Sequence, residues 1–138
     1  MKIVPRETLP AAVEKIEAFQ AMLMEHPNRI EFEHTHAFVP GVYARTMYLP
    51  ADTVLTSKIH LVENFFFLSV GHLTVFDSFG GRHDVHAPYL GITKPGTKRA
   101  LYSHVDSVVT TFHPNTDDCQ DIAELERRFV ADSYGDET

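Results

Sequence analysis

The chain lacks the residues needed for a disulfide and the apolar runs needed for a secretory leader or a membrane span. Cys119 is the single cysteine in 138 residues, so it has no partner for an internal disulfide or a thiolate zinc site. The N-terminal MKIVPRETLP contains no apolar run, and no later stretch approaches the roughly 20 apolar residues that span a bilayer. We therefore expect a cytoplasmic protein with no membrane partner.

Two common catalytic signatures are also missing. No glycine-rich loop of the phosphate-binding type is present, and the serines lack the sequence of a nucleophile elbow. What is present is typical of a globular chain: 43% of the residues are hydrophobic and 22% are charged. This length suits one domain with a real core, so we expect a single domain over residues 1–138.

The charge is unevenly distributed along the chain. The formal net charge is −7, and the part from residue 115 onward holds eight acidic and two basic residues. Residues 78–104 are the opposite, with four basic residues and one acidic residue. The net negative charge argues against nucleic acid as a partner, whereas the basic stretch could bind a small anion.

Periodicity predicts an all-β domain with a helix at each end. Val13, Ile16, Phe19 and Leu23 recur at helical spacing, which predicts a helix over residues 9–25. A β-barrel is expected over residues 29–113, because short β-branched and aromatic segments alternate there with Pro and Gly. The expected strands are residues 30–38, 42–49, 53–60, 65–70, 73–77, 83–87, 90–93, 99–103 and 107–112.

Two local signals add detail to this outline. Residues 79–82, Phe-Gly-Gly-Arg, predict a hairpin turn, because glycine accepts the positive φ of a tight turn. Asn115 or Thr116 can cap a C-terminal helix over residues 116–134, with acidic residues in its first turn.

One run resembles the first sequence motif of the cupin superfamily. That motif has an H-x-H pair, a Glu four or five residues after the second His, and a Gly about seven residues further on. Lys58 and His60 share one side of an extended strand, and His60, Glu63 and Gly71 match the motif approximately. The resemblance implies a jelly-roll barrel, the double-stranded β-helix.

A second run resembles the other cupin motif, P-G-x-x-H. Pro95 and Gly96 fit it, and Arg99 stands where the last metal ligand is expected. Cupins commonly bind a divalent metal through three His and one Glu, but here Lys58 and Arg99 replace two ligands. A guanidinium is effectively never a metal ligand, so a Zn, Fe, Mn or Ni site would need further side chains. Candidates for a completed set are His60 and Glu63 with His104, or with His34, His36, His72 or His113.

Three interpretations of the altered motif remain open. Lys58, Glu63 and Arg99 could form an internal ion-pair network. They could instead mark an anion pocket, or a metal could be retained through recruited ligands. The candidate ligand-binding residues are Lys58, His60, Glu63, Arg99, Lys98, Tyr102, Arg45 and Phe67.

A further resemblance covers most of the second half of the chain. Residues 95–104 and 107–114, followed by an acidic helix, look like small cupin-like proteins of tailed bacteriophages and prophages. This resemblance implies the host cell cytoplasm as the location. It suggests sequestration of a host metabolite or defence signal, or a structural role in assembly.

We favour a small-molecule-binding protein that holds an anionic, nucleotide- or carboxylate-like ligand in the barrel, without a required cofactor. One alternative is a metal-dependent cupin enzyme of the isomerase or dioxygenase type, with His60 and Glu63 as ligands or as an acid–base pair. The other alternative is a structural or assembly protein. Cupins often pair through their sheets, so we expect a homodimer or a larger homo-oligomer.

Overall fold

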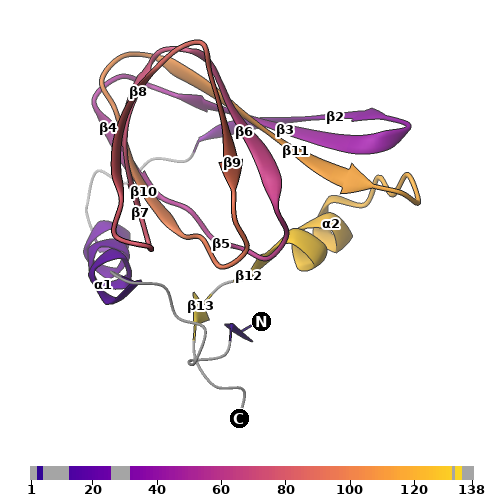
Figure 1. Ribbon diagram of the computed structural model, residues 1–138, viewed down its shortest axis with the longest axis horizontal. Coiled ribbons are helices and arrows are strands. Elements are labelled where there is room, and N and C mark those ends of the chain that lie inside the picture. The colour runs from indigo at the N-terminus through magenta and orange to yellow at the C-terminus, as the bar shows by residue number, and fades with distance from the viewer. Residues whose placement is uncertain (1–2, 5–12, 26–31, 132, 135–138) are drawn as a thin grey trace.

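Two antiparallel sheets face each other and enclose the core (Figure 1). The computed structural model describes residues 3–4, 13–25, 32–131 and 133–134. The four-stranded sheet has the order β4 (Thr53–Thr56), β10 (Arg99–Ser103), β7 (His72–Asp77), β8 (Arg82–His86). The five-stranded sheet has the order β2 (Glu33–Val39), β3 (Gly41–Leu49), β11 (Ser107–Asn115), β6 (Asn64–Val70), β9 (Tyr89–Thr93).

The chain crosses repeatedly between the two sheets, which is the connectivity of a jelly roll. After β6 it enters the four-stranded sheet as β7 and β8, returns as β9, crosses again as β10 and returns as β11. Each of the nine expected strand segments contains strand, and β10 has the predicted bounds. The segment expected over residues 53–60 is interrupted at residues 57–58, so that it forms β4 and the two-residue β5 (Ile59–His60).

The hairpin predicted at residues 79–82 joins β7 to β8, which pair in antiparallel register. Gly80 has φ +94°, a conformation that favours glycine. The Asp77 carboxylate accepts hydrogen bonds from the backbone N–H groups of Phe79 and Gly81 and so holds the turn closed.

Alternation of side chains along the strands supplies the core between the sheets. On β7, Leu73 and Val75 face inwards and are at most 5% exposed, while His72 and Phe76 lie on the opposite face. The core consists of inward-facing apolar residues from both sheets: Leu49, Leu55, Phe66, Leu68, Leu73, Val75, Val85, Leu101 and Val109.

The N-terminal helix, α1 (Val13–Met24), lies beside β4 at the edge of the four-stranded sheet (Figure 1). Ile16 is its buried side chain, at 5% exposure. The first residues of the predicted helix, 9–12, lie outside the described part of the chain. Neither helix in the described residues is long and apolar enough to cross a membrane.

The C-terminal helix is shorter than predicted at both ends. α2 spans Ile122–Phe129, and Asp121 caps it by accepting a hydrogen bond from the Glu124 N–H. The side chain of Asn115 instead bonds the backbone N–H and C=O of Cys119, which keeps residues 116–121 in a loop. The prediction of a helix over residues 116–134 is therefore wrong for the described residues outside 122–129.

The described residues after α2 are extended rather than helical. β12 (Val130–Ala131) pairs with β5, and β13 (Ser133–Tyr134) pairs with β1 (Ile3–Val4). The Leu61 N–H also donates to the Phe129 carbonyl at 2.8 Å. These bonds attach α2 to the end of the barrel, next to the segment that carries His60.

Candidate functional site

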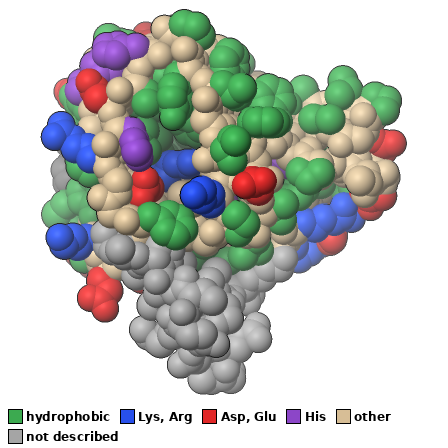
Figure 2. Space-filling view, viewed as in Figure 1, with side chains coloured by type: hydrophobic (Ala, Val, Ile, Leu, Met, Phe, Trp, Pro, Cys, Tyr) green, Lys and Arg blue, Asp and Glu red, His purple; other side chains and the backbone are tan. Residues whose placement is uncertain are grey.

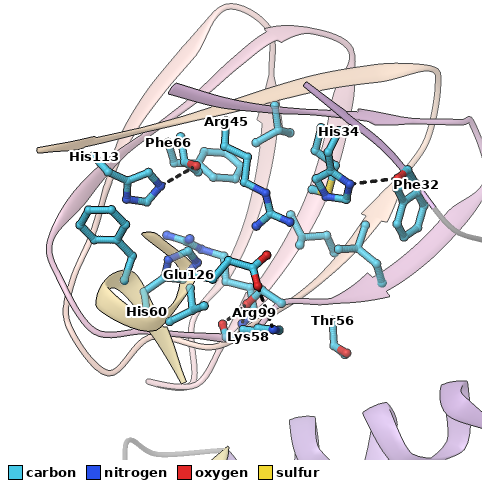
Figure 3. Close-up of a pocket in the computed structure, with 18 of the residues that line it drawn as sticks. Phe32, His34, Arg45, Thr56, Lys58, His60, Phe66, Arg99, His113 and Glu126 are labelled. Atoms are coloured by element: carbon cyan, nitrogen blue, oxygen red, sulfur yellow. Dashed lines mark hydrogen bonds and ion pairs between the residues drawn. The ribbon is translucent and has the colours of Figure 1, made fainter. Parts of the chain in front are cut away.

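A cavity of about 270 Å³ lies between the two sheets and is covered at one end by α2 (Figure 3). Its volume is near the lower end of the range for small-molecule pockets, roughly 300–1,000 Å³. The apolar lining is Phe32, Tyr43, Met47, Leu55, Phe66, Leu101, Val109, Leu125, Phe129 and Val130. The polar lining is His34, Arg45, Thr56, Ser57, Lys58, His60, Arg99, Thr111, His113 and Glu126.

Strand alternation places the polar side chains inside the barrel. Arg45 lies two residues from Tyr43 on β3, and both line the cavity. His113 lies two residues from Thr111 on β11, and its Nε2 is 2.9 Å from the Thr111 hydroxyl. Arg99 enters from the first residue of β10, so both sheets contribute a guanidinium.

The cavity has more positive than negative side chains. Arg45, Arg99 and Lys58 line it, whereas Glu126 is the one carboxylate among the described lining residues. Lys58 Nζ is 3.8 Å from Glu126 Oε2, and both side chains are substantially exposed. Glu126 therefore offsets Lys58 at the mouth and leaves the two arginines further inside.

Neither arginine has a carboxylate at ion-pairing distance in the described residues, although Asp77, the register partner of Arg99, acts on Arg99 from farther away. Within the described residues, the ion pairs involve neither Arg45 nor Arg99. The Arg45 Nε is buried without a hydrogen-bond partner there. The Arg99 guanidinium lies 5.0 Å from the ring centroid of Phe66, a cation–π contact that supplies no acceptor. The Nε–H of Arg45 is therefore available to a bound anion.

Burial and the arginines keep the cavity histidines neutral near pH 7. Burial, followed by the charges of Arg99, His113 and Arg45, lowers the pKa of His60 to about 3. Burial and then Arg45 lower the pKa of His113 to about 4. The pKa of His34 is lowered too, again by burial first and Arg45 second. Each imidazole can therefore offer one donor and one acceptor to a ligand.

Four of the predicted ligand-binding residues meet in this cavity, together with His34 and His113, which were named only as possible metal ligands. Lys58, His60, Arg99 and Arg45 all line it, although they come from three strands and a loop. Lys58 and His60 do share a side, as their two-residue spacing indicates.

The other predicted ligand residues lie elsewhere. Glu63 is exposed beside a second, shallow groove that shares His113 with the cavity, and Lys98 is buried at 2% exposure without lining the cavity. Tyr102 donates a hydrogen bond to Asp52 on the outer face of the four-stranded sheet. Phe67 is adjacent to Phe66 on β6, so it faces the opposite way, and Phe66 is the ring in the cavity.

The ion-pair network expected between Lys58, Glu63 and Arg99 is also not formed. Glu63 lies outside the cavity, and the carboxylate near Lys58 belongs to Glu126 of α2. The side chain beside His60 is Asn64, whose Nδ2 is 3.4 Å from the His60 Nδ1. Asn64 is four residues after His60, so the motif spacing could have identified it.

Glu126 and the wall residues of α2 were not predicted as part of the site. α2 lies more than 20 residues beyond the last motif residue, and its apolar stripe shows only that it packs against something. Its position over the cavity depends on the pairing of β12 with β5. Each of these strands has only two residues, which is too short to be recognised in the sequence.

The cavity residues do not fit the divalent metal that the cupin resemblance implies. Its histidines do not form a group of close ligand atoms, and the two guanidiniums in the same space would repel a dication. The set His60, Glu63 and His104 is also dispersed over the cavity, the shallow groove and the outer face of a sheet.

A different group in the described residues could hold a metal. One ligand atom from each of His72, Asp84 and His104 lies within 4.8 Å of the other two. His72 and His104 were named from the sequence as recruits to the barrel site, but they lie outside the barrel.

Comparisons with known proteins give structural neighbours and no sequence relatives. No family model matches the chain, and no curated protein matches it. A Klebsiella pneumoniae protein with a double-stranded β-helix domain superposes with a TM-score of 0.55 at 11% identity, covering 68% of this chain and 85% of that one.

Two further neighbours have assigned names. Salicylate 1,2-dioxygenase from Pseudoaminobacter salicylatoxidans, solved with gentisate, has a TM-score of 0.55 at 11% identity and covers 88% of this chain but 36% of its own. A putative ethanolamine utilization protein Q from Salmonella typhimurium LT2 has a TM-score of 0.51 at 10% identity, covering 62% and 70%. Together with the strand order, these neighbours show that the chain has the double-stranded β-helix fold of the cupins.

Proposed function

We propose that this protein binds a small anionic molecule, bearing a carboxylate or phosphate group, in the barrel cavity. The single observation that carries the proposal is the pair of inward-facing guanidiniums, Arg45 and Arg99, neither of which forms an ion pair in the described part of the chain. An anion would provide the missing counter-charge and the missing hydrogen-bond acceptors.

The energetics favour an occupant of this charge. Burying an ion costs several kcal/mol unless it is paired, and an unmade hydrogen bond to a buried donor costs roughly 1–3 kcal/mol. Burial lowers the pKa of Arg99, and the side chain nevertheless remains a cation at neutral pH. Carboxylates and phosphates match the fork of N–H groups on a guanidinium, which makes them the natural ligands.

The rest of the lining indicates that the ligand has an apolar part. Phe66, Leu101 and Val109 form a hydrophobic wall beside the arginines, and α2 adds Leu125 and Phe129. A cavity of about 270 Å³ suits a compact molecule, such as a small aromatic or aliphatic acid, better than a dinucleotide. Gentisate, the molecule in the dioxygenase neighbour, is an aromatic carboxylate and so belongs to the proposed ligand class.

Neutral histidines would then provide orientation rather than charge. His60 and His113 border the arginines, and the His113 Nδ1 is buried without a hydrogen-bond partner among the described residues. A hydroxyl or a second carboxylate oxygen of the ligand could satisfy this nitrogen. The resemblance to phage and prophage proteins suggests a setting in which the bound molecule is a host metabolite or defence signal withdrawn from use.

Binding of small acids by purified, untagged protein tests the proposal. Isothermal titration calorimetry with benzoate, salicylate, inorganic phosphate and AMP covers the carboxylate and phosphate classes. We expect at least one of these probes to bind with one site per chain. Arg45→Gln and Arg99→Gln should each weaken that binding roughly 10- to 100-fold, the range for losing a charged hydrogen bond.

Arg82→Gln is the matched control. Arg82 also stacks on an aromatic ring, lying 5.7 Å from the Phe76 centroid, but it is exposed on the outer face of the four-stranded sheet. Its loss should leave the affinity unchanged. Absence of binding by every probe at millimolar concentration, or equal weakening by Arg82→Gln and Arg99→Gln, would contradict the proposal.

A further inference from the structure

Three histidines form a row across the outer face of the four-stranded sheet, on the side away from the cavity. His72 on β7 is the register partner of His86 on β8, and the His104 N–H donates to the His72 carbonyl at 3.0 Å. The His72 ring stacks between the other two, with centroids 3.8 Å from His86 and 4.0 Å from His104. Figure 2 shows histidine side chains gathered beside an acidic one at the upper left, near β8.

Asp84 brings a carboxylate to two of these rings. It lies two residues before His86 on β8, so it shares the outer face. Its Oδ1 is 2.7 Å from the Nε2 of His72 and 3.9 Å from the Nε2 of His104. The three ligand atoms therefore lie close together above the sheet.

The spacing of these atoms suits a tetrahedral metal. With metal–nitrogen and metal–oxygen bonds of about 2.0–2.2 Å, neighbouring ligands in a tetrahedron lie about 3.3–3.5 Å apart. The two separations from Asp84 bracket this range, and no ligand atom is farther than 4.8 Å from another. Closing the site requires the rings of His72 and His104, which are stacked at 15°, to rotate toward Asp84.

We propose that His72, Asp84 and His104 form a binding site for a divalent transition metal, with zinc as the preferred probe. Two imidazoles and one carboxylate suit Zn²⁺, Ni²⁺ or Cu²⁺, whereas Mg²⁺ and Ca²⁺ prefer oxygen ligands. Three protein ligands leave a fourth position for water or for a group on another molecule. The side chains of His72, Asp84 and His104 are 24%, 58% and 35% exposed, so an ion can enter from solvent.

Neighbouring side chains would hold the ligands in place. The Thr74 hydroxyl donates to Asp84 at 3.2 Å and contacts the His104 Nε2 at 2.7 Å. A bound metal would replace the contact between Thr74 and His104. The hydrogen bond from Thr74 to Asp84 would remain and orient the carboxylate, a common arrangement around metal ligands. His86 packs on the ring of His72 and so restricts its rotation.

Zinc binding by chelator-treated, untagged protein tests this site. We expect calorimetry to give one Zn²⁺ per chain with a micromolar or lower dissociation constant, and no binding of Mg²⁺. His72→Ala, His104→Gln and Asp84→Asn should each weaken zinc binding at least tenfold. With Co²⁺, the visible absorption typical of four-coordinate cobalt should appear in the wild type and disappear in these variants.

His83→Ala is the matched control, because His83 pairs with Asp77 at 3.1 Å but has no third ligand in the described residues. It should bind zinc like the wild type, as should Arg45→Gln, which alters the cavity alone. Failure of the wild type to bind zinc stoichiometrically would overturn the proposal, as would equal weakening by His83→Ala. Circular dichroism of the metal-free variants checks that each one is folded.

Discussion

The neutral histidines in the cavity should make the protein sensitive to mild acid. His60 and His113 have pKa values of about 3 and about 4 in the folded chain, against 6.5 for an ordinary histidine. Because both values are lowered, the unfolded chain binds more protons than the folded chain below about pH 6.5. The stabilisation is therefore fully present above that pH and is lost as the pH falls toward the folded values.

The size of the effect follows from these pKa values. Between pH 7 and pH 5 an unfolded histidine gains roughly three quarters of a proton while the folded one gains little, which costs about 2 kcal/mol for each residue. His60 and His113 together should lower the free energy of unfolding by about 4 kcal/mol over this interval. A typical total is only about 5–15 kcal/mol, so the change is large enough to measure.

Urea unfolding at pH 7, 6 and 5, in a buffer without carboxylate or phosphate, measures this loss. His60→Gln and His113→Gln should each remove about half of it, and the double variant most of it. Val109→Ala is the control, since Val109 is a buried core residue without a charge. It should lower the free energy of unfolding equally at every pH. The reasoning is refuted if the double variant and the wild type lose the same amount between pH 7 and pH 5.

Three further results are expected. Leu125→Ala should lower the free energy of unfolding by about 2–5 kcal/mol, as measured by urea unfolding, because Leu125 is fully buried. It should also weaken anion binding, as measured by calorimetry, because it loosens α2 over the cavity. Gly71→Ala should lower the melting temperature far more than Gly41→Ala: both glycines have positive φ, but only at position 71 would an added Cβ meet Ser107, whose Cα would be 2.7 Å away. Anion affinity should fall as NaCl rises from 50 to 500 mM, because over roughly this range the Debye screening length falls below the width of the cavity. Binding driven only by apolar contacts would show no such fall.

The barrel could be predicted from the sequence because its strands repeat a strong local pattern. Apolar Leu73 and Val75 alternate with polar His72 and Thr74 on β7, for example, and turn residues separate the segments. The end of the chain could not be predicted in the same way. Its acidic residues could cap a helix at several positions. Asp121 is the N-cap because the hydrogen bonds from Asn115 to Cys119 keep the preceding residues in a loop.

The candidate site was predicted in part, and the missed residues have one physical cause. Lys58, His60, Arg45 and Arg99 face the cavity as expected, but Glu126 reaches it from α2 through long-range pairing of two-residue strands. No short-range signal contains that information. Glu63 was chosen for its chemistry, whereas the backbone places Asn64 beside His60.

Strand parity explains why the metal-type ligands and the anion-type ligands lie on different faces. Arg99 and His104 are separated by an odd number of residues along β10 and its continuation, so they lie on opposite faces of the sheet. Arg99 enters the cavity, and His104 joins the row of His72 and His86 outside it. A single site using both residues would require a register change in β10. If a metal acts in this protein, parity therefore favours the outer face, and the anion and the metal should bind independently.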